Sequence, residues 1–154
     1  MPQCLRLIAL DDEDLAIISA NLQDSVIRVA DMAYLPRTKR FALVAARFDW
    51  VCAAGGSNER CETGLHFERV LKVARSGFDQ TAAETHLNLL SIGFRAGDAP
   101  AGQVELTFSG GAALRLDVEC LEAQLRDLGP RWKAKGQPGH PVDDLLGSTA
   151  KQTT

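Results

Sequence analysis

The chain has 154 residues, of which 45% are hydrophobic and 24% are charged, and these values are typical of one globular domain. Its formal net charge of −3 argues against a nucleic-acid-binding protein, because such proteins usually carry a basic excess or a basic stripe. No apolar run reaches the roughly 20 residues of a membrane span, and residues 1–14 do not resemble a signal peptide, so we expect a cytoplasmic protein with no membrane partner and with reduced cysteines.

The N-terminal segment predicts a strand followed by a helix. Residues 4–10 are short and aliphatic, as in a buried strand, and residues 11–24 have the pattern of an amphipathic helix. Asp11 or Asp12 can cap its first free N–H groups, and adjacent acids in one helical turn favour capping over metal binding, because they do not converge on a single point. The apolar stripe of this helix consists of Leu15, Ile18 and Leu22, widened by Ile17.

From Ser25 onward the pattern changes to a period of two residues. Residues 25–35 and 40–51 flank the sequence PRTK and predict a β-hairpin, with Pro36 setting the turn. Further strands are expected at 64–76, 86–96, 103–109 and 112–119, with Gly110-Gly111 as the turn between the last two. The aromatic side chains of the hairpin lie among aliphatic residues, so we expect burial rather than base stacking.

The end of the domain has the pattern of a helix. Leu121, Leu125 and Leu128 share one helical face over residues 118–130, and Gly129 followed by Pro130 is a typical helix stop. We therefore expect one domain over residues 1–130. Residues 131–154 are polar and rich in glycine and proline, which predicts a mostly disordered tail.

The element order predicts an α+β domain with an antiparallel sheet of about six or seven strands. The N-terminal helix at 11–24 follows the first strand, and the helix at 118–130 caps the sheet. A series of hairpins of this length is expected to curl into a partly closed barrel, an outline that resembles pleckstrin-homology-like domains.

Cys52, Cys61 and His66 have the spacing C-x8-C-x4-H around a glycine-rich stretch. Structural zinc sites place paired cysteines two to four residues apart, so this spacing argues against a metal site. A catalytic thiol needs a base beside the sulfur, and His66 is the only nearby candidate. The simpler interpretation is a hairpin with a long mobile tip at residues 53–63 and one cysteine near each strand end. Whether the two thiols face each other across the ladder is left open.

No catalytic motif stands out in the remaining sequence. The chain has no G-x-S-x-G, H-E-x-x-H, P-loop or G-x-G-x-x-G pattern. We therefore predict no catalytic residue, cofactor or metal. Residues 25–75 hold nine basic and five acidic residues, which form either a solvated surface or a modest basic face for an acidic partner.

Several segments in this order resemble a known family. The quoted runs are LRLIALDDEDLAIISANLQDSVIRVADMAYLPRTKRFALVAARFDW, then GLHFERVLKV, then VECLEAQLRDLGP. Over about residues 4–132 the chain is similar to a family of short proteobacterial proteins catalogued as domain of unknown function 2948. The resemblance implies a bacterial cytoplasmic protein and supplies no catalytic or binding residues.

Two functional hypotheses remain. The first is a non-enzymatic interaction or regulatory module that binds a protein partner or a second copy of itself through its hairpins or a groove beside the C-terminal helix. The alternative is a small enzyme or metabolite-binding protein with a site near the 52–69 hairpin. The candidate ligand or redox residues for that site are Cys52, Cys61, His66 and Arg69.

Overall fold

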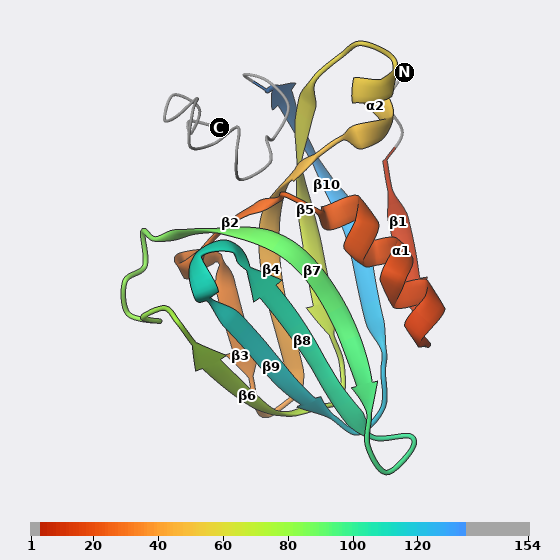
Figure 1. Cartoon of the computed structure of the whole chain (residues 1–154), viewed down its shortest axis with the longest axis vertical. Helices are drawn as coiled ribbons and strands as arrows, with labels where there is room; N and C mark the ends of the chain where they lie inside the picture. The colour runs from red at the N-terminus through yellow and green to blue at the C-terminus, as the bar shows by residue number, and fades with distance from the viewer. Residues whose placement is uncertain (1–3, 135–154) are drawn as a thin grey trace.

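The computed structural model describes residues 4–134, which form one highly twisted sheet with two helices and two 3-10 turns (Figure 1). The strands are β1 (Arg6–Ala9), β2 (Val26–Arg28), β3 (Met32–Leu35), β4 (Arg40–Phe48), β5 (Glu59–Phe67), β6 (Val70–Ser76), β7 (His86–Ala96), β8 (Gly102–Phe108), β9 (Ala113–Val118) and β10 (Ala123–Lys133). The helices are α1 (Asp12–Leu22) and α2 (Trp50–Ala54), and the 3-10 turns are η1 (Val29–Asp31) and η2 (Ser109–Gly111).

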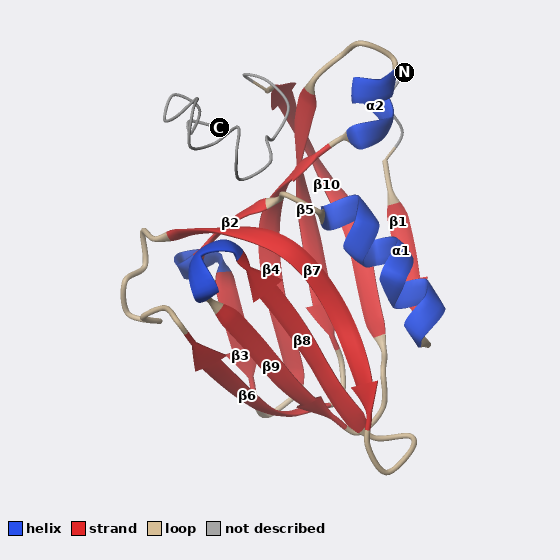
Figure 2. Cartoon of the chain, viewed as in Figure 1, coloured by secondary structure: helices blue, strands red, loops and turns tan. Residues whose placement is uncertain are grey.

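All ten strands belong to one antiparallel sheet in the order β1-β10-β5-β4-β2-β7-β8-β9-β6, with β3 paired to β4 beside this path. The prediction of an antiparallel α+β domain is confirmed, but the expected six or seven strands were too few. The pairing path is open, with β1 and β6 at its ends, so the strands do not close into the predicted barrel (Figure 2).

The N-terminal helix is confirmed. Asp11 caps α1, and its side chain accepts a hydrogen bond of 2.9 Å from the amide of Asp14. Leu15, Ile18 and Leu22 are fully buried, as the stripe predicted, whereas Ile17 is 53% exposed and does not widen it. The helix lies against β7, where Ser19 accepts a hydrogen bond from the amide of Ile92. The preceding strand, β1, is present but not buried as predicted, because it is an edge strand paired only with β10 and its Ile8 is 56% exposed.

The central hairpin is confirmed in part. Its turn is present, but η1 divides the first predicted strand, residues 25–35, into β2 and β3, and the strand predicted at 40–51 ends at Phe48. β3 and β4 pair from Met32–Leu43 to Leu35–Arg40 around the predicted PRTK turn. β4 is the most enclosed of these strands, because it also pairs with β5 and β2. Its residues alternate between the core face, where Phe41 is fully buried, and a half-buried face that includes Val44.

The segment predicted as one strand at 64–76 forms the end of β5 and the whole of β6. β5 ends at Phe67, and Arg69 adopts a positive φ of 60° in the turn that follows. β6 then pairs with β9 rather than with β5. The strands predicted at 86–96, 103–109 and 112–119 correspond to β7, β8 and β9, and the Gly110-Gly111 turn between the last two is present with positive φ angles at both glycines.

The predicted C-terminal capping helix is wrong. Residues 123–133 form β10, which pairs with β1 on one side and β5 on the other. The spacing of Leu121, Leu125 and Leu128 fits a helix, but Ala123 and Leu125 also alternate with exposed residues in a strand pattern. Two flanking ladders satisfy the backbone groups of this segment, and this tertiary pairing outweighs its helical propensity. Without that helix, the outline no longer matches a pleckstrin-homology-like domain.

The stretch expected to be a mobile tip, residues 53–63, has regular structure at both ends. α2 occupies Trp50–Ala54, and β5 already begins at Glu59, so only a short connection joins them. At the other end of the domain, β10 continues past residue 130 to Lys133. The part of the predicted tail from residue 135 onward lies outside the described residues.

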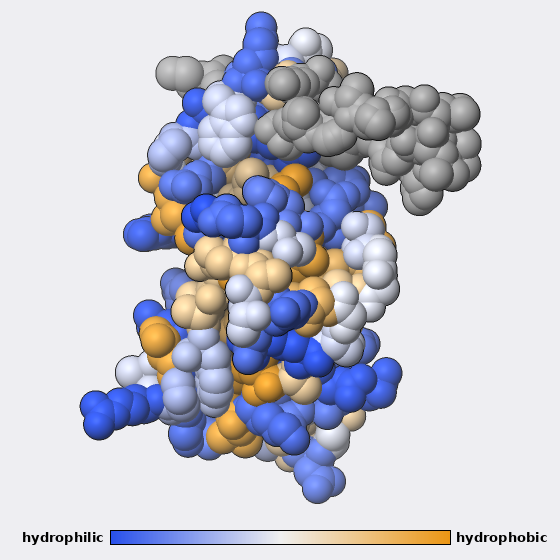
Figure 3. Space-filling view, turned by 90° about the vertical axis from the view of Figure 1, so that its left-hand side faces the viewer, coloured by the Kyte–Doolittle hydropathy of each residue, from blue (hydrophilic) through white to orange (hydrophobic). Residues whose placement is uncertain are grey.

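The hydrophobic core lies between the inner face of the sheet and α1. Its largest fully buried side chains include Phe41, Phe67 and Phe108. The hairpin aromatics were expected to be buried, and Phe41 is part of this core. Phe48 is fully buried on the other face of β4, beside the Arg60 guanidinium, whereas Trp50 is only half-buried. Seen from the left-hand side of Figure 1, the hydrophobic surface forms small patches separated by polar residues (Figure 3). Neither α1 nor any other helix in residues 4–134 has the length and apolar character needed to cross a bilayer.

Candidate functional site

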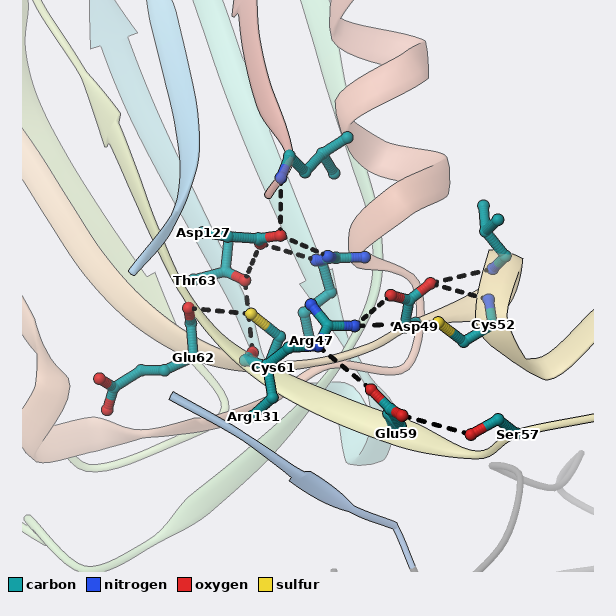
Figure 4. Close-up of polar contacts among 12 residues, drawn as sticks. Arg47, Asp49, Cys52, Ser57, Glu59, Cys61, Glu62, Thr63, Asp127 and Arg131 are labelled. Atoms are coloured by element: carbon teal, nitrogen blue, oxygen red, sulfur yellow. Dashed lines mark hydrogen bonds and ion pairs between the residues drawn. The ribbon is translucent and has the colours of Figure 1, made fainter. Parts of the chain in front are cut away.

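A cluster of polar side chains lies on the core side of the sheet, where β4, β5 and β10 meet the start of α2 (Figure 4). Its centre is a buried salt bridge in which Arg47 Nη2 and Nε donate to Asp127 at 2.7 and 3.1 Å. Asp127 also accepts hydrogen bonds from the Leu5 amide at 2.8 Å and from Thr63 Oγ1 at 2.7 Å. Both charged side chains are almost fully buried, so this pair is closed to solvent.

The surroundings of Asp127 keep its carboxylate charged. Burial alone would raise the pKa of Asp127, but the hydrogen bonds from Arg47, the Leu5 amide and Thr63 outweigh this effect and lower the pKa below its ordinary value. The carboxylate is therefore an acceptor of four hydrogen bonds, and it is not poised to exchange a proton near neutral pH.

Arg131 joins a second set of groups in the same cluster. Its guanidinium donates to the Asp49 carboxylate through Nη2 and to Glu59 Oε1 at 3.1 Å through Nε. Asp49 also caps α2 by accepting hydrogen bonds from the amides of Val51 and Cys52. Burial opposes the charge of Asp49, yet the hydrogen bonds from Cys52 and Arg131 lower its pKa. Arg131 therefore ties α2 and β5 to the end of β10.

The two predicted cysteines lie beside this cluster as free thiols. Cys52 is in α2, where its Sγ lies 4.0 Å from Arg131 Nη2, and Cys61 is in β5 with 1% exposure. Burial is the main cause that raises the pKa of both thiols, and for Cys61 the charge of Asp127 adds to it. A raised pKa keeps a thiol protonated and weakly nucleophilic.

The open question about the two thiols has a definite answer. The ladder partners of Cys61 are Arg47 on β4 and Arg131 on β10, whereas Cys52 belongs to a helix and has no ladder partner. The cysteines therefore do not face each other across a hairpin, although both are neighbours of Arg131.

His66 and Arg69, the other two candidates, lie away from the cysteines. His66 is five residues beyond Cys61 on β5, so it points to the opposite face at a distance of about 16 Å along the strand. Its ring contacts Glu68 at 2.6 Å and Gln124 at 3.2 Å. Arg69 lies within 3.8 Å of Glu119 and 3.7 Å of Glu122 on the surface. The structure thus does not gather the four predicted residues into one site.

On the opposite, outer face of the sheet is a groove of about 250 Å³. Its floor is formed by Val26, Val44 and Ala46, which are half-buried side chains on adjacent strands. The side chains around this floor are Arg28, Asp31, Glu62, His86 and Trp132. Trp132 is 40% exposed, although large aromatic side chains are usually well buried. The groove is the place where an apolar surface, an aromatic ring and charged groups meet next to solvent.

Comparison with protein families identifies the chain. The family described as "Protein of unknown function (DUF2948)" matches residues 5–140. The chain belongs to the DUF2948 family. The resemblance inferred from the sequence is therefore confirmed. Neither the search of curated proteins nor the search of solved structures found a match for this DUF2948 chain.

The residues that organise both sites of this DUF2948 chain were missed by sequence reasoning. Arg47 follows Leu43 and Ala45 on the core face of β4, and Asp127 follows Ala123 and Leu125 on the core face of β10. A charged residue that continues an apolar face in this way is a signal of a buried ion pair. Arg131 and Trp132 were assigned to the tail, because the prediction ended the domain at residue 130. Residues 4–134 hold no group of three or more His, Cys, Asp or Glu side chains placed to bind a metal ion.

Proposed function

We propose that this DUF2948 chain is a non-enzymatic interaction module that binds a protein partner through the groove on its outer sheet face. The observation that carries the proposal is an apolar floor of Val26, Val44 and Ala46 that stays open to solvent beside the half-exposed Trp132. Aromatic residues next to apolar positions and a polar rim are typical of protein–protein interfaces.

The alternative, a small enzyme with a site near the 52–69 hairpin, has less support from the geometry. In the polar cluster each carboxylate already holds an arginine, as Asp127 does with Arg47 and Asp49 does with Arg131. The nearby thiols have raised pKa values. These groups stabilise the junction of β4, β5, β10 and α2. A binding role for the groove, unlike the enzyme alternative, explains why apolar side chains and Trp132 are left partly exposed there.

The dimensions of the groove favour a docking site for one side chain. Pockets for small molecules usually have volumes of about 300–1,000 Å³, which is larger than this groove. A protein partner can insert one anchoring side chain here and place its remaining contacts on the surrounding strands. The outer faces of β2, β4 and β5, which are neighbouring strands in the sheet, lie beside the groove for those contacts.

The test is a substitution that fills the groove floor. Ala46→Arg places a long side chain between Val26 and Glu62, its cross-strand neighbours, while Ala74→Arg adds the same side chain on the exposed face of edge strand β6. Tagged proteins would be used to isolate partners from the source cells, and each partner would then be purified and titrated by calorimetry. We expect a partner that binds wild type and Ala74→Arg equally and binds Ala46→Arg at least about tenfold more weakly.

Other outcomes have definite meanings. A concentration-dependent dimer that is lost only in Ala46→Arg would identify a second copy of the chain as the partner. Equal binding of every partner by Ala46→Arg and wild type would overturn the proposal. Turnover in a broad hydrolase or transferase screen, abolished by substitution of a residue in the 52–69 region, would replace it with the enzyme alternative.

A further inference from the structure

The charges around the groove are unequally paired. Arg28 is held by Asp31 at 3.2 Å and by Glu84 at 3.3 Å, so its positive charge is already neutralised by two carboxylates. Glu62 lies on the groove side of β5, and its carboxylate has no hydrogen bond or ion pair with any described residue. Among the side chains that line the groove, the charge without a partner in the described residues is therefore the negative charge of Glu62.

Two other nitrogen-containing side chains near the groove do not neutralise Glu62. Arg60 is on the same face of β5 but does not line the groove, and its charge interacts with that of Asp24. Its Nη1 donates to the carbonyls of Ala46 and Asp24, and its guanidinium lies 5.5 Å from the centre of the Phe48 ring. His86 is the ladder partner of Arg28 and lies on the β7 side of the groove, with β2 and β4 between it and β5.

Trp132 lies on the same side of the groove as the Glu62 carboxylate. Its ladder partner is Arg60, two residues before Glu62, so Trp132 and Glu62 are diagonal neighbours at about 7–8 Å on one sheet face. Glu62 is also the ladder partner of Ala46, which belongs to the apolar floor. An indole, a carboxylate and an aliphatic floor thus lie next to one another.

We propose that the groove binds the side chain of an arginine or lysine from the protein partner. The cation would lie between the Glu62 carboxylate and the Trp132 indole, and its aliphatic stem would lie along Val44 and Ala46. This inference rests on the proposed function, because it names the chemistry of the anchoring side chain for the same groove. An acidic side chain is disfavoured, since it would meet Glu62 and an Arg28 that is already paired.

The experiment uses the full chain and small probes in place of the partner. N-acetyl-L-arginine amide and N-acetyl-L-lysine amide supply the cation, N-acetyl-L-citrulline amide is the neutral isostere of the arginine probe, and N-acetyl-L-aspartate amide carries the opposite charge. Binding is followed by two-dimensional NMR through the indole N–H of Trp132 and the backbone amides of Val44, Ala46 and Glu62. Trp50, the only other tryptophan, is replaced by phenylalanine to assign the indole signal.

We expect saturable shifts at these positions with the arginine and lysine probes in the millimolar range, and binding of citrulline at least about fivefold weaker. Glu62→Gln preserves the shape of the side chain and is expected to weaken the cationic probes about fivefold, and Trp132→Leu is expected to weaken them by a similar factor. Glu13→Gln makes the same change of charge in the exposed first turn of α1 and is expected to leave the affinity unchanged.

The outcomes separate this inference from the proposed function. Equal binding of arginine and citrulline, tighter binding of aspartate, or equal effects of Glu62→Gln and Glu13→Gln would overturn the basic-side-chain inference. If Ala46→Arg still abolished partner binding in any of these cases, the groove would remain a protein-docking site of different chemistry. If no probe shifted the groove signals and Ala46→Arg bound partners normally, both proposals would fail.

Discussion

Arg47 on β4 and Asp127 on β10 form a salt bridge across β5, the strand that separates them in the sheet. The two side chains reach over the inner face of β5, where Thr63 donates a third hydrogen bond to the same carboxylate. One ion pair at 2.7 Å therefore joins β10 to β4, a strand distant from it in the sequence. Because both charges are buried, the loss of either partner leaves the other charge uncompensated.

The first prediction concerns this pair. Arg47→Met and Asp127→Leu are each expected to lower the free energy of unfolding by about 3–5 kcal/mol, because each leaves an unpaired buried charge. The double variant removes both charges and is expected to recover most of that loss. Urea denaturation followed by circular dichroism measures all three variants. A double variant as unstable as the sum of the single variants would show that the two residues do not act as a pair.

The second prediction concerns acid stability. The folded pKa values of Asp127 and Asp49 lie below their ordinary value of 3.8, so both carboxylates stabilise the fold above that pH. This contribution is lost as the pH falls through 3.8 and then through the lower folded values. The urea midpoint of the wild type is therefore expected to decrease steeply below about pH 4.

Asp127→Asn is the comparison for this pH series, since it removes one of the two carboxylates. The urea midpoint of Asp127→Asn is expected to be lower than that of the wild type at neutral pH and to decrease less on acidification. Equal slopes for Asp127→Asn and wild type between neutral and acidic pH would contradict the assigned role of Asp127.

The third prediction concerns the start of α1. Asp11→Ala removes the acceptor for the Asp14 amide and is expected to cost about 1 kcal/mol of stability. Asp11→Asn keeps a capping oxygen and is expected to stay close to wild type. Thermal denaturation of the two variants distinguishes capping from a general effect of charge, which would lower both equally.

The fourth prediction concerns the thiols. Cys4 is exposed, whereas Cys61 is buried and has a raised pKa, so a neutral-pH alkylating reagent is expected to label Cys4 quickly and Cys61 only after unfolding. Cys52 is half-buried with a raised pKa and is expected to react at an intermediate rate. Mass spectrometry of digested samples over time gives the three rates. Rapid labelling of Cys61 in the folded chain would contradict its burial and would revive the thiol-site hypothesis.

The elements predicted well from the sequence are those whose pattern depends on near neighbours. Asp11 caps α1 from the adjacent residues, and the turn of the β3–β4 hairpin is set by Pro36 and the residues after it. The segment around Leu125 gives two compatible patterns, one helical and one alternating. Only the presence of β1 and β5 on its two sides decides between them, and no local signal reports those neighbours.

The candidate sites also depend on contacts between residues that are distant in the sequence. The cysteines and His66 attracted attention because they lie close together in the sequence, yet strand alternation places Cys61 and His66 on opposite faces. Arg47 and Asp127 are 80 residues apart, and Glu62 is a diagonal neighbour of Trp132 because Trp132 pairs with Arg60 in the β5–β10 ladder. Pairs of this kind depend on strand order, which the sequence pattern does not report.

In the bulged part of β10, between Asp127 and Arg131, it matters whether the number of inserted or deleted residues is odd or even. Between Asp127 and Arg131, β10 advances four residues while its partner β5 advances only two, from Thr63 to Cys61. Deleting two residues within 128–130 would keep every later side chain on its present face. Deleting one would exchange the faces, turning the Arg131 guanidinium towards the groove and the Trp132 indole towards the polar cluster. In related chains, insertions and deletions here are therefore expected in steps of two.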